Sequence, residues 1–370
     1  MNIAFLYIAE AYQCYHSAAI ALDLAARPGV HVTTYYNEPD APHHLERVRL
    51  AYGAPSMDYR RLKRSWATRL MQSIRRLGLF KEMVLRDNLA ELDGYDAIFA
   101  VEMTVSPIRK MGARHAKLIY YPHGAGDRAV TYHRRVSGFD FALLPGPKYA
   151  ERMLAQGLIH PNGFALPGYV KLETSDRLRA AQGPLFDNGR PIVLYSAHKV
   201  PGLQSWSAHI EPMLAAFSET DEYNLIVAPH VKLFHRRSRK IRNAWEARST
   251  PNVRIDTGSD LSVDMSYTTA ADIFIGDVSS QVYEFLIRPR PCIFLNPHRV
   301  KWRGNPDFLH WTLGDVIEDP SELMRAIRNA HARHHLYVKK QEELVSASIG
   351  DCTPGASKRA ADAVLAFMSR

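Results

Sequence analysis

Short apolar runs alternate with segments of helical character along the whole chain. In the first half the strand-like runs occupy 2–8, 31–36, 95–101, 117–121 and 139–144, and in the second half 191–196, 223–228, 253–256, 272–276 and 291–295. Segments between them, such as 15–27, repeat apolar residues at helical spacing. Short apolar strands separated by helices predict parallel sheets with helices on both faces. The pattern therefore predicts an α/β fold with Rossmann-like layers.

A polar stretch separates the two series of strands. Pro167-Gly168 and the residues around 175–190 are rich in turn formers. A chain of 370 residues is also long for one α/β core. We therefore expect an N-terminal Rossmann-like domain over 1–170, a C-terminal Rossmann-like domain over 171–350, and a C-terminal helix over 351–370 that packs back on the first domain.

Composition excludes several classes of protein. Hydrophobic residues make up 46% and charged residues 23%, which is ordinary for a globular chain and excludes disordered, collagen-like and disulfide-scaffold proteins. The three cysteines, Cys14, Cys292 and Cys352, are scattered, which argues against a disulfide framework or a cysteine zinc site and favours a reducing compartment. No cleavable signal or run of 18 apolar residues is evident, so we expect a cytoplasmic protein that does not span a membrane.

The positive charge is concentrated in one segment. The chain carries 47 Lys and Arg against 38 Asp and Glu, a net charge of +9, and 60–81 holds eight of these cations and no acid. Helical spacing puts five apolar residues on one stripe, namely Leu62, Trp66, Leu70, Ile74 and Leu77. It puts four arginines on other faces, namely Arg61, Arg64, Arg75 and Arg76. A basic amphipathic helix with a tryptophan is typical of an interfacial membrane anchor. The alternative is a helix packed on the first domain with solvated arginines.

A second basic cluster follows at 232–248. It could extend the same surface or meet substrate phosphates. Nucleic acid is a disfavoured partner, because aromatic residues do not alternate with the charges and no zinc-finger, basic-zipper or RNP motif is present.

The segment Asp277-Val278-Ser279-Ser280 follows an apolar strand and begins a predicted helix over 279–287. The first turn of a helix offers free N–H groups and a positive dipole end, and the two hydroxyls beside them favour a diphosphate. The alternative is that Asp277 or Ser279 only caps the helix.

Three histidines each end a predicted strand. His123, in Pro122-His123-Gly124-Ala125-Gly126-Asp127, is suited to general-base chemistry, and its glycines permit close approach of a substrate. His198 and His230, the latter with Lys232, are suited to meeting a phosphate. Loops after parallel strands line the ligand crevice of open α/β sheets, so these residues predict a site there. A structural histidine in a tight turn is the alternative for His123.

In this order, the motifs resemble those of the CDP-glycerol glycerophosphotransferase family, the teichoic-acid type polymerases and primases with a GT-B fold of two lobes facing a cleft. The resemblance covers roughly 115–300. It rests on His123-Gly124, Gly168-Tyr169-Val170-Lys171, Pro229-His230, and Asp277-Val278-Ser279-Ser280 followed by Glu284-Phe285. Val170, Lys171, Val231 and Glu284 depart from the family pattern of Pro, Arg, Pro and Asp.

The resemblance implies roles for these residues. His123 would be the base or acceptor-orienting residue on an acceptor-side first domain that includes Gly124 and Asp127. His230 would stabilise the transferring phosphate. The donor would be held by Ser279, Ser280, Asp277, His198, Gly168, Lys171, Lys232 and Glu284.

The implied reaction is attack by an acceptor hydroxyl on the β-phosphorus of a CDP-activated polyol, with CMP expelled. The acceptor would be lipid-linked or a glycan, in cell-envelope synthesis, and the enzyme would lie on the inner face of the cytoplasmic membrane. No cofactor is implied, and no carboxylate cluster with metal-ligand spacing stands out. Two alternatives remain open: a GT-B glycosyltransferase with a nucleotide-sugar donor, and a non-catalytic module that binds an anionic glycan.

Overall fold

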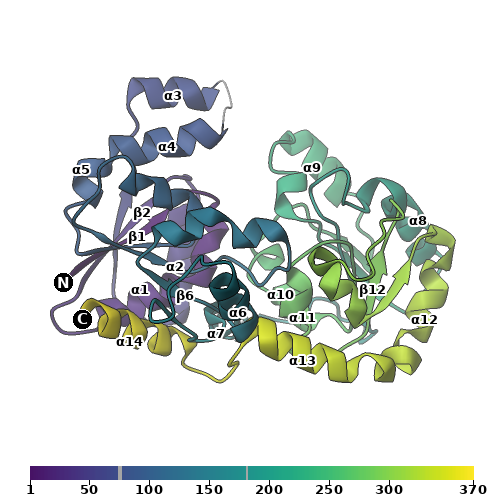
Figure 1. Cartoon of the computed structure of the whole chain (residues 1–370). Helices are drawn as coiled ribbons and strands as arrows, with labels where there is room; N and C mark the ends of the chain where they lie inside the picture. The colour runs from purple at the N-terminus through teal and green to yellow at the C-terminus, as the bar shows by residue number, and fades with distance from the viewer. Residues whose placement is uncertain (74–76, 181) are drawn as a thin grey trace. The chain divides into compact units, whose positions relative to one another are not determined.

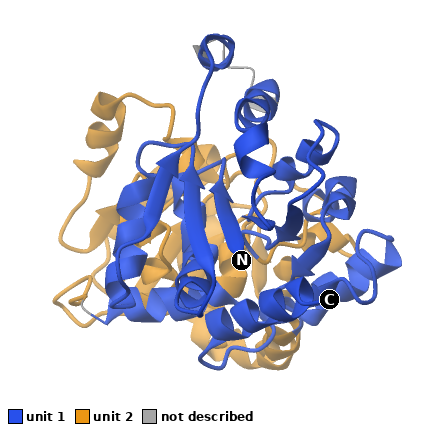
Figure 2. Ribbon diagram, turned by 90° about the vertical axis from the view of Figure 1, so that its left-hand side faces the viewer, with its two compact units in different colours: residues 1–124, 129–180, 347–370 blue, residues 125–128, 181–346 orange. Residues whose placement is uncertain are grey.

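Two parallel β-sheets, one in each of two units, form the framework of the chain (Figure 2). The computed structural model describes residues 1–73, 77–180 and 182–370. Unit 1 comprises 1–124, 129–180 and 347–370, and unit 2 comprises 125–128 and 181–346. We expected the second domain to begin at 171, and the structure keeps 171–180 in unit 1, because α7 (Val170–Arg179) packs on α2 (Ala41–Ala51) and α14 (Ala356–Met368) of that unit.

The C-terminal helix packs back on the first unit, as expected. Helix α14 contacts α1 (Ala18–Ala25), Phe367 stacks on Phe141 with ring centroids 4.6 Å apart, and Asp362 forms an ion pair with Arg27 at 2.5 Å. The chain therefore begins and ends in unit 1.

The sheet of unit 1 has the order β3-β2-β1-β4-β5-β6-β7, with every pair parallel. Its strands are β1 (Asn2–Tyr7), β2 (His31–Tyr36), β3 (Asp58–Arg61), β4 (Ala97–Ala100), β5 (Lys117–Tyr120), β6 (Phe141–Leu143) and β7 (Phe164–Ala165). Its other helices are α3 (Trp66–Ser73), α4 (Leu77–Asp87), α5 (Leu89–Leu92) and α6 (Pro147–Ala155). The strand order reverses between β1 and β4.

The sheet of unit 2 repeats this topology in the order β10-β9-β8-β11-β12-β13, again with every pair parallel. Its strands are β8 (Ile192–Ser196), β9 (Asn224–Val227), β10 (Val253–Ile255), β11 (Ile273–Gly276), β12 (Cys292–Leu295) and β13 (Asp315–Ile317). Its helices are α8 (Trp206–Ser218), α9 (Arg239–Glu246), α10 (Ser266–Ala270), α11 (Gln281–Phe285) and α12 (Leu323–Arg333), while α13 (Val338–Ile349) runs from unit 2 into unit 1 (Figure 1). Both units are doubly wound, which confirms the predicted α/β class.

All ten predicted strands are present, and the three that sequence missed lie at sheet edges. β3 has no buried residue, β7 is two residues long, and β13 buries one of its three. An edge strand faces water along one side and therefore needs no apolar run.

The basic segment 60–81 does not form the single amphipathic helix that its spacing predicts. Arg61 ends β3, and α3 and α4 follow as two separate helices (Figure 1). Leu62 is buried, whereas Trp66 and Leu70 are 79% and 55% exposed, so the apolar stripe is divided. Ile74, Arg75 and Arg76 lie outside the described residues.

Arg64 is tied into unit 1 rather than free at its surface. Its guanidinium donates to the side-chain oxygen of Asn37 at 2.8 Å and to the backbone carbonyl of the same residue at 2.5 Å, and it lies over the Phe80 ring. Over the described part of the chain, no helix is both long enough and apolar enough to cross a bilayer.

Gly168 occupies a position that only glycine fits. Its φ is +94°, and a Cβ there would lie 2.2 Å from the backbone oxygen of Asp351. We predict that Gly168→Ala lowers the free energy of unfolding by about 2 kcal/mol or more, from left-handed strain and the clash. Urea unfolding measures this change.

Gly183→Ala is the matched control, because no heavy atom lies within 4 Å of a Cβ at Gly183 and its φ is not in the left-handed region. Equal unfolding free energies for the two variants would contradict the structural role of Gly168.

Candidate functional site

The candidate donor site lies where the strand order of unit 2 reverses, between β8 and β11. Loops leaving adjacent strands in opposite directions open a crevice at such a point. The sequence places His198 after β8, His230 after β9, and Asp277 to Ser280 after β11. The structure brings them together: the backbone N–H of His198 lies 2.8 Å from an Asp277 carboxylate oxygen, and the rings of His198 and His230 are 6.0 Å apart.

Asp277 holds two loops of this site together. Its carboxylate is 1% exposed and accepts hydrogen bonds from the backbone N–H groups of His198, Val278 and Ser205 at 2.8, 2.6 and 2.7 Å. The Ser205 hydroxyl donates to it at 2.8 Å. We expected Asp277 to hold a donor, and in the structure its carboxylate is occupied by these four donors of the protein and joins the loops after β8 and β11.

Burial raises the pKa of Asp277 to about 6, although the four hydrogen bonds oppose this shift. The group is therefore ionised at neutral pH. An ionised carboxylate only accepts hydrogen bonds, so it suits the N–H and O–H donors that surround it. Because these donors come from the loops after β8 and β11, Asp277 is the shared fixed point of the two loops, meaning the residue to which both are hydrogen-bonded.

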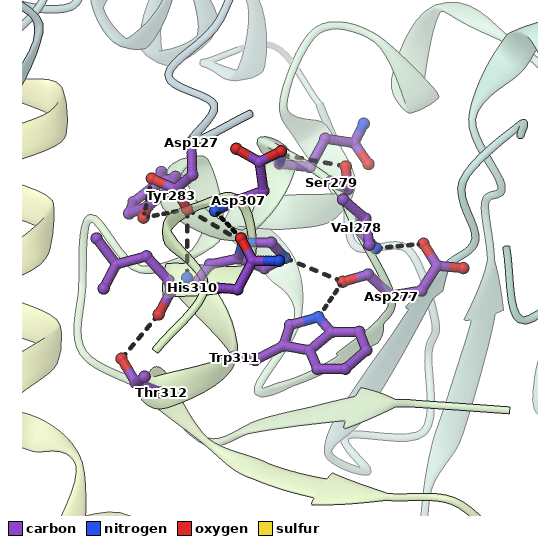
Figure 3. A network of polar contacts seen from close by, with 12 residues as sticks. Asp127, Asp277, Val278, Ser279, Tyr283, Asp307, His310, Trp311 and Thr312 are labelled. Atoms are coloured by element: carbon purple, nitrogen blue, oxygen red, sulfur yellow. Dashed lines mark hydrogen bonds and ion pairs between the residues drawn. The ribbon is translucent and has the colours of Figure 1, made fainter. Parts of the chain in front are cut away.

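A second buried network fixes the same loop from the other side (Figure 3). The Tyr283 hydroxyl lies 2.8 and 2.7 Å from the two carboxylate oxygens of Asp127, and the backbone N–H of His310 donates to one of them at 3.2 Å. The expected acceptor-side role of Asp127 is not supported, because its carboxylate is 2% exposed and belongs to unit 2.

His310 connects Asp127 to the Asp277 loop. Its Nδ1 lies 3.1 Å from the Asp127 carboxylate and its Nε2 lies 3.1 Å from the backbone oxygen of Asp277, which also accepts from Trp311 Nε1 at 2.7 Å (Figure 3). The His310 ring therefore bridges the Asp127 carboxylate and the backbone of Asp277.

His198 and His230 share one tautomer. The Nδ1 of His198 accepts from the backbone N–H of Val200 at 3.2 Å, and the Nδ1 of His230 accepts from that of Lys232 at 3.1 Å. A neutral imidazole that accepts at Nδ1 carries its hydrogen on Nε2. Each ring therefore offers one Nε2–H donor.

Burial is the main reason that both imidazoles are neutral. It lowers the pKa of His198 to about 4, with Arg128 and Lys199 adding to the shift. It lowers the pKa of His230 to about 3, with Lys199, His198 and Lys232 adding to it. Positive charge at this site thus comes from Arg128, Lys199 and Lys232, and the histidines act as neutral N–H donors. An anionic ligand suits both features.

Ser279 and Ser280 remain partly exposed beside this group. The Ser279 hydroxyl accepts from the backbone N–H of Gln281 at 3.2 Å, while Ser280, the N-cap residue of α11, makes no side-chain capping bond. The helix that follows, α11, has five residues, so the dipole is weaker than a helix over 279–287 would provide. Glu284 lies on α11 and is 5% exposed, so a direct donor contact is not supported.

A second polar group lies at the corresponding reversal of the unit 1 sheet, between β1 and β4. His123 follows β5, and its Nδ1 lies 2.8 Å from the backbone oxygen of Val101. A carbonyl accepts, so Nδ1 carries the proton and Nε2 presents a lone pair. Gly124 beside it has φ +133°, and its carbonyl accepts from the Tyr149 hydroxyl at 3.1 Å.

Glu102, which sequence reasoning missed, faces that lone pair. Its carboxylate lies 3.8 Å from His123 Nε2, accepts from Gln13 at 2.7 Å, and is 3.7 Å from the Lys81 ammonium. A carboxylate there stabilises the imidazolium that forms when Nε2 takes a proton. Glu102 follows β4 in the sequence, so the strand-end rule that selected His123 would also have found it.

His16 and Lys171 complete the unit 1 group. His16 is 5% exposed, and burial, followed by Lys171 and His123, lowers its pKa well below the ordinary value. Lys171 is 6% exposed on α7. Gly168 and Lys171, which we expected to hold the donor, both belong to unit 1, whereas the expected domain boundary put Lys171 in the second domain.

Within neither unit do the described residues bring three metal-ligating side chains together. The sequence did not point to four residues that surround the unit 2 group: Arg128, Tyr283, His310 and Trp311. They act through contacts between residues up to 183 positions apart in the sequence. No local motif signals such contacts.

One family model matches part of the chain. The family model described as CDP-Glycerol:Poly(glycerophosphate) glycerophosphotransferase matches residues 192–361, which include His198, His230 and Asp277 to Ser280. No curated protein sequence matches the chain.

Solved structures share the fold. The S. aureus MnaA–UDP co-structure matches with a TM-score of 0.65 and 12% identity, covering 100% of this chain and 97% of that one. The UDP-GlcNAc 2-epimerase from Neisseria meningitidis bound to UDP-GlcNAc matches with a TM-score of 0.62 and 13% identity, covering 99% of this chain and 100% of that one. The wall teichoic acid polymerase TagF matches with a TM-score of 0.65 and 12% identity, covering 100% of this chain and 89% of that one. These likenesses confirm the GT-B-like fold.

Removal of the Asp277 carboxylate tests its role as the shared fixed point. In Asp277→Ala the buried N–H groups of His198, Val278 and Ser205 lose their acceptor, so we expect the free energy of unfolding to fall by about 3 kcal/mol or more. Urea unfolding followed by circular dichroism measures it.

Asp272→Ala serves as the control at the other end of β11, where an exposed carboxylate accepts one backbone N–H from Ile192 at 2.7 Å. If the two substitutions cost the same, Asp277 is not the fixed point of the site.

Proposed function

We propose that this chain, whose residues 192–361 match the family model of CDP-glycerol:poly(glycerophosphate) glycerophosphotransferases, transfers a polyol phosphate from a CDP-activated donor to an acceptor hydroxyl. Glycerol phosphate is the favoured polyol, and a lipid-linked or glycan acceptor in cell-envelope synthesis is the favoured acceptor. The observation that carries the proposal is the pair of neutral Nε2–H donors on His198 and His230, inside the matched region and surrounded by cations.

In the proposed reaction, the acceptor oxygen forms a bond to the β-phosphorus while the bond from that phosphorus to the bridging oxygen of CMP breaks. Phosphoryl-type transfer depends mainly on positioning and on neutralising the charge of the phosphates. The Nε2–H groups of His198 and His230, the hydroxyls of Ser279 and Ser280, and Lys232 supply donors and charge for a diphosphate without any titration of the two histidines.

The acceptor proton needs a base, and His123 is suited to that part. Its Nε2 presents a lone pair because Nδ1–H is held by Val101, and Glu102 at 3.8 Å stabilises the resulting imidazolium. The proton released from the acceptor hydroxyl would therefore go to His123 Nε2, and CMP would leave with the electron pair of the broken bond.

The same proposal places the enzyme at the inner face of the cytoplasmic membrane. Trp66 and Leu70 are exposed on α3, and Arg61, Lys63 and Arg69 are exposed beside them. Exposed apolar side chains rimmed by cations suit the interface of an anionic bilayer. The cysteines Cys14, Cys292 and Cys352 are free thiols, which fits a reducing compartment.

Nucleotide release separates this proposal from its alternatives. Purified protein with CDP-glycerol and a membrane extract is expected to release CMP, which chromatography detects. Release of a nucleoside diphosphate from a nucleotide sugar would indicate a glycosyltransferase instead, and a binding module would release neither.

Two variants locate the chemistry. His123→Ala is expected to lower kcat about a hundredfold or more by removing the base. His230→Asn keeps an oxygen that can accept from the Lys232 N–H but removes Nε2–H, so a loss of about a hundredfold is expected with folding intact. His331→Gln, on an exposed position of α12, is the control. Full activity in both site variants would contradict the assignment.

Cosedimentation with anionic vesicles tests the membrane surface. Trp66→Ser with Leu70→Ser is expected to weaken binding about tenfold or more, since each buried side chain contributes about 1.5 to 3 kcal/mol. Val130→Ser with Leu336→Ser is the control, because these side chains are 62% and 57% exposed elsewhere. Equal binding by both double variants would remove α3 from the proposal.

A further inference from the structure

Helix α9 and the turn before it carry a dense run of cations. Five of the seven residues from 236 to 242 are basic, and all but Arg242 are exposed; they are Arg236, Arg237, Arg239, Lys240 and Arg242. We call these five the α9 cations. The only acid nearby in sequence, Glu246, accepts from the Thr257 hydroxyl at 2.5 Å and is directed to the protein.

The α9 cations differ from other arginines of unit 2 in their ion pairs. In the described part of the chain, none of the five forms an ion pair, whereas other arginines of unit 2 do. Arg248 pairs with Glu211 at 2.7 Å, Arg328 with Glu222 at 2.8 Å, and Arg333 with Asp315 at 2.8 Å. Five adjacent like charges repel one another, and an anionic partner bound to this surface would reduce that electrostatic repulsion.

The apolar side of the helix is already covered. Trp245 packs edge-on against Trp206 at 5.0 Å and against Phe234 at 6.2 Å, and Arg248 lies over its ring. Ile241, at 41% exposed, is the large apolar residue left at the surface of α9. The surface thus differs from α3, where Trp66 and Leu70 project.

These features select the chemistry of the partner. Insertion into a bilayer needs exposed apolar side chains, and single-stranded nucleic acid needs exposed aromatic rings for base stacking. The α9 surface offers charge with no exposed aromatic ring, and Ile241 is its one large apolar side chain at the surface. A flexible chain of phosphodiesters with no bases or lipid tails fits it.

The run also continues directly from the donor site. His230 caps η5 (Val231–Leu233), Lys232 lies in η5, and Arg236 follows within four residues. A polyanion lying on the α9 cations would therefore have phosphates beside the segment that carries His230.

We propose that the α9 cations form a holding surface for a polyanionic phosphodiester chain, the acceptor or product polymer of this enzyme. This inference rests on the proposed function for the identity of the polymer. It adds a contact that lies outside the donor site and that depends on the number of phosphates in the chain.

Equilibrium binding to the full chain tests the surface, with a glycerol-phosphate oligomer of about ten units as the probe and no donor present. In Arg236→Gln/Arg237→Gln/Arg239→Gln/Lys240→Gln, we expect affinity for the oligomer to fall about tenfold or more and its salt dependence to become shallower. Affinity for CDP-glycerol is expected to stay unchanged.

The matched control removes the same charge elsewhere in unit 2, through Lys301→Gln/Arg303→Gln/Lys339→Gln/Lys340→Gln at exposed positions. Equal losses in both variants would overturn the proposal, because net charge alone would explain them. A loss of CDP-glycerol binding as large as the loss of oligomer binding would also overturn it. The proposal would also be overturned if the α9 variant lost affinity for anionic vesicles or single-stranded RNA while its affinity for the oligomer stayed unchanged.

This result is separable from the proposed function. If the wild-type protein binds the oligomer through α9 but transfers no polyol phosphate, the transfer proposal is contradicted and the proposed polymer-binding surface is retained. Transfer to a short acceptor, with equal oligomer binding by wild type and the α9 variant, overturns the surface alone.

Discussion

A carboxylate buried at the strand-order reversal of unit 2 is the contact on which the donor site depends. Asp277 ends β11 and accepts from backbone N–H groups of the loop after β8, so two loops that diverge from the sheet are joined through one residue. The arrangement holds because every acceptor position meets a donor, which offsets the cost of burying the charge. His310 then secures the backbone of the same residue from the Asp127 side. The loops after β8 and β11 are therefore held together beside the Nε2–H groups of His198 and His230.

Unit 1 has a carboxylate at the equivalent place and uses it differently. Glu102 follows β4, which neighbours β1 as β11 neighbours β8. Gln13 and Thr104 side chains donate to it, but it also lies 3.8 Å from the Nε2 of His123. In unit 2 the carboxylate is surrounded by backbone donors and is structural. In unit 1 it faces the Nε2 of an imidazole whose Nδ1 is held by the Val101 carbonyl, which is the geometry used in the proposed proton transfer. The same topology thus places two carboxylates in different surroundings.

Sequence alone predicted the inner part of each sheet, since a strand buried on both faces needs a continuous apolar run. The edge strands β3, β7 and β13 carry no such signal. The rule that polar residues at strand ends line a crevice found His123, His198, His230 and Asp277. It could not separate residues that touch a ligand from residues that hold a loop, because that difference depends on partners far away in sequence. Asp127, for example, is occupied by Tyr283, 156 positions later. Gly168 was likewise chosen for a motif, whereas its conformation and the nearby Asp351 backbone require glycine.

Two surfaces of the chain carry clusters of cations and differ in character. On α3 the cations accompany exposed Trp66 and Leu70, and on α9 they surround a helix whose tryptophan is packed inward. Charge attracts both an anionic bilayer and a polyanion, but only apolar side chains add the favourable free energy of leaving water for the bilayer. The position of one tryptophan on each helix, outward at Trp66 and inward at Trp245, therefore decides which kind of anion each surface suits. Under the proposed function, extension of a charged polymer on a lipid-linked acceptor would use both kinds of surface, and each unit carries one of them.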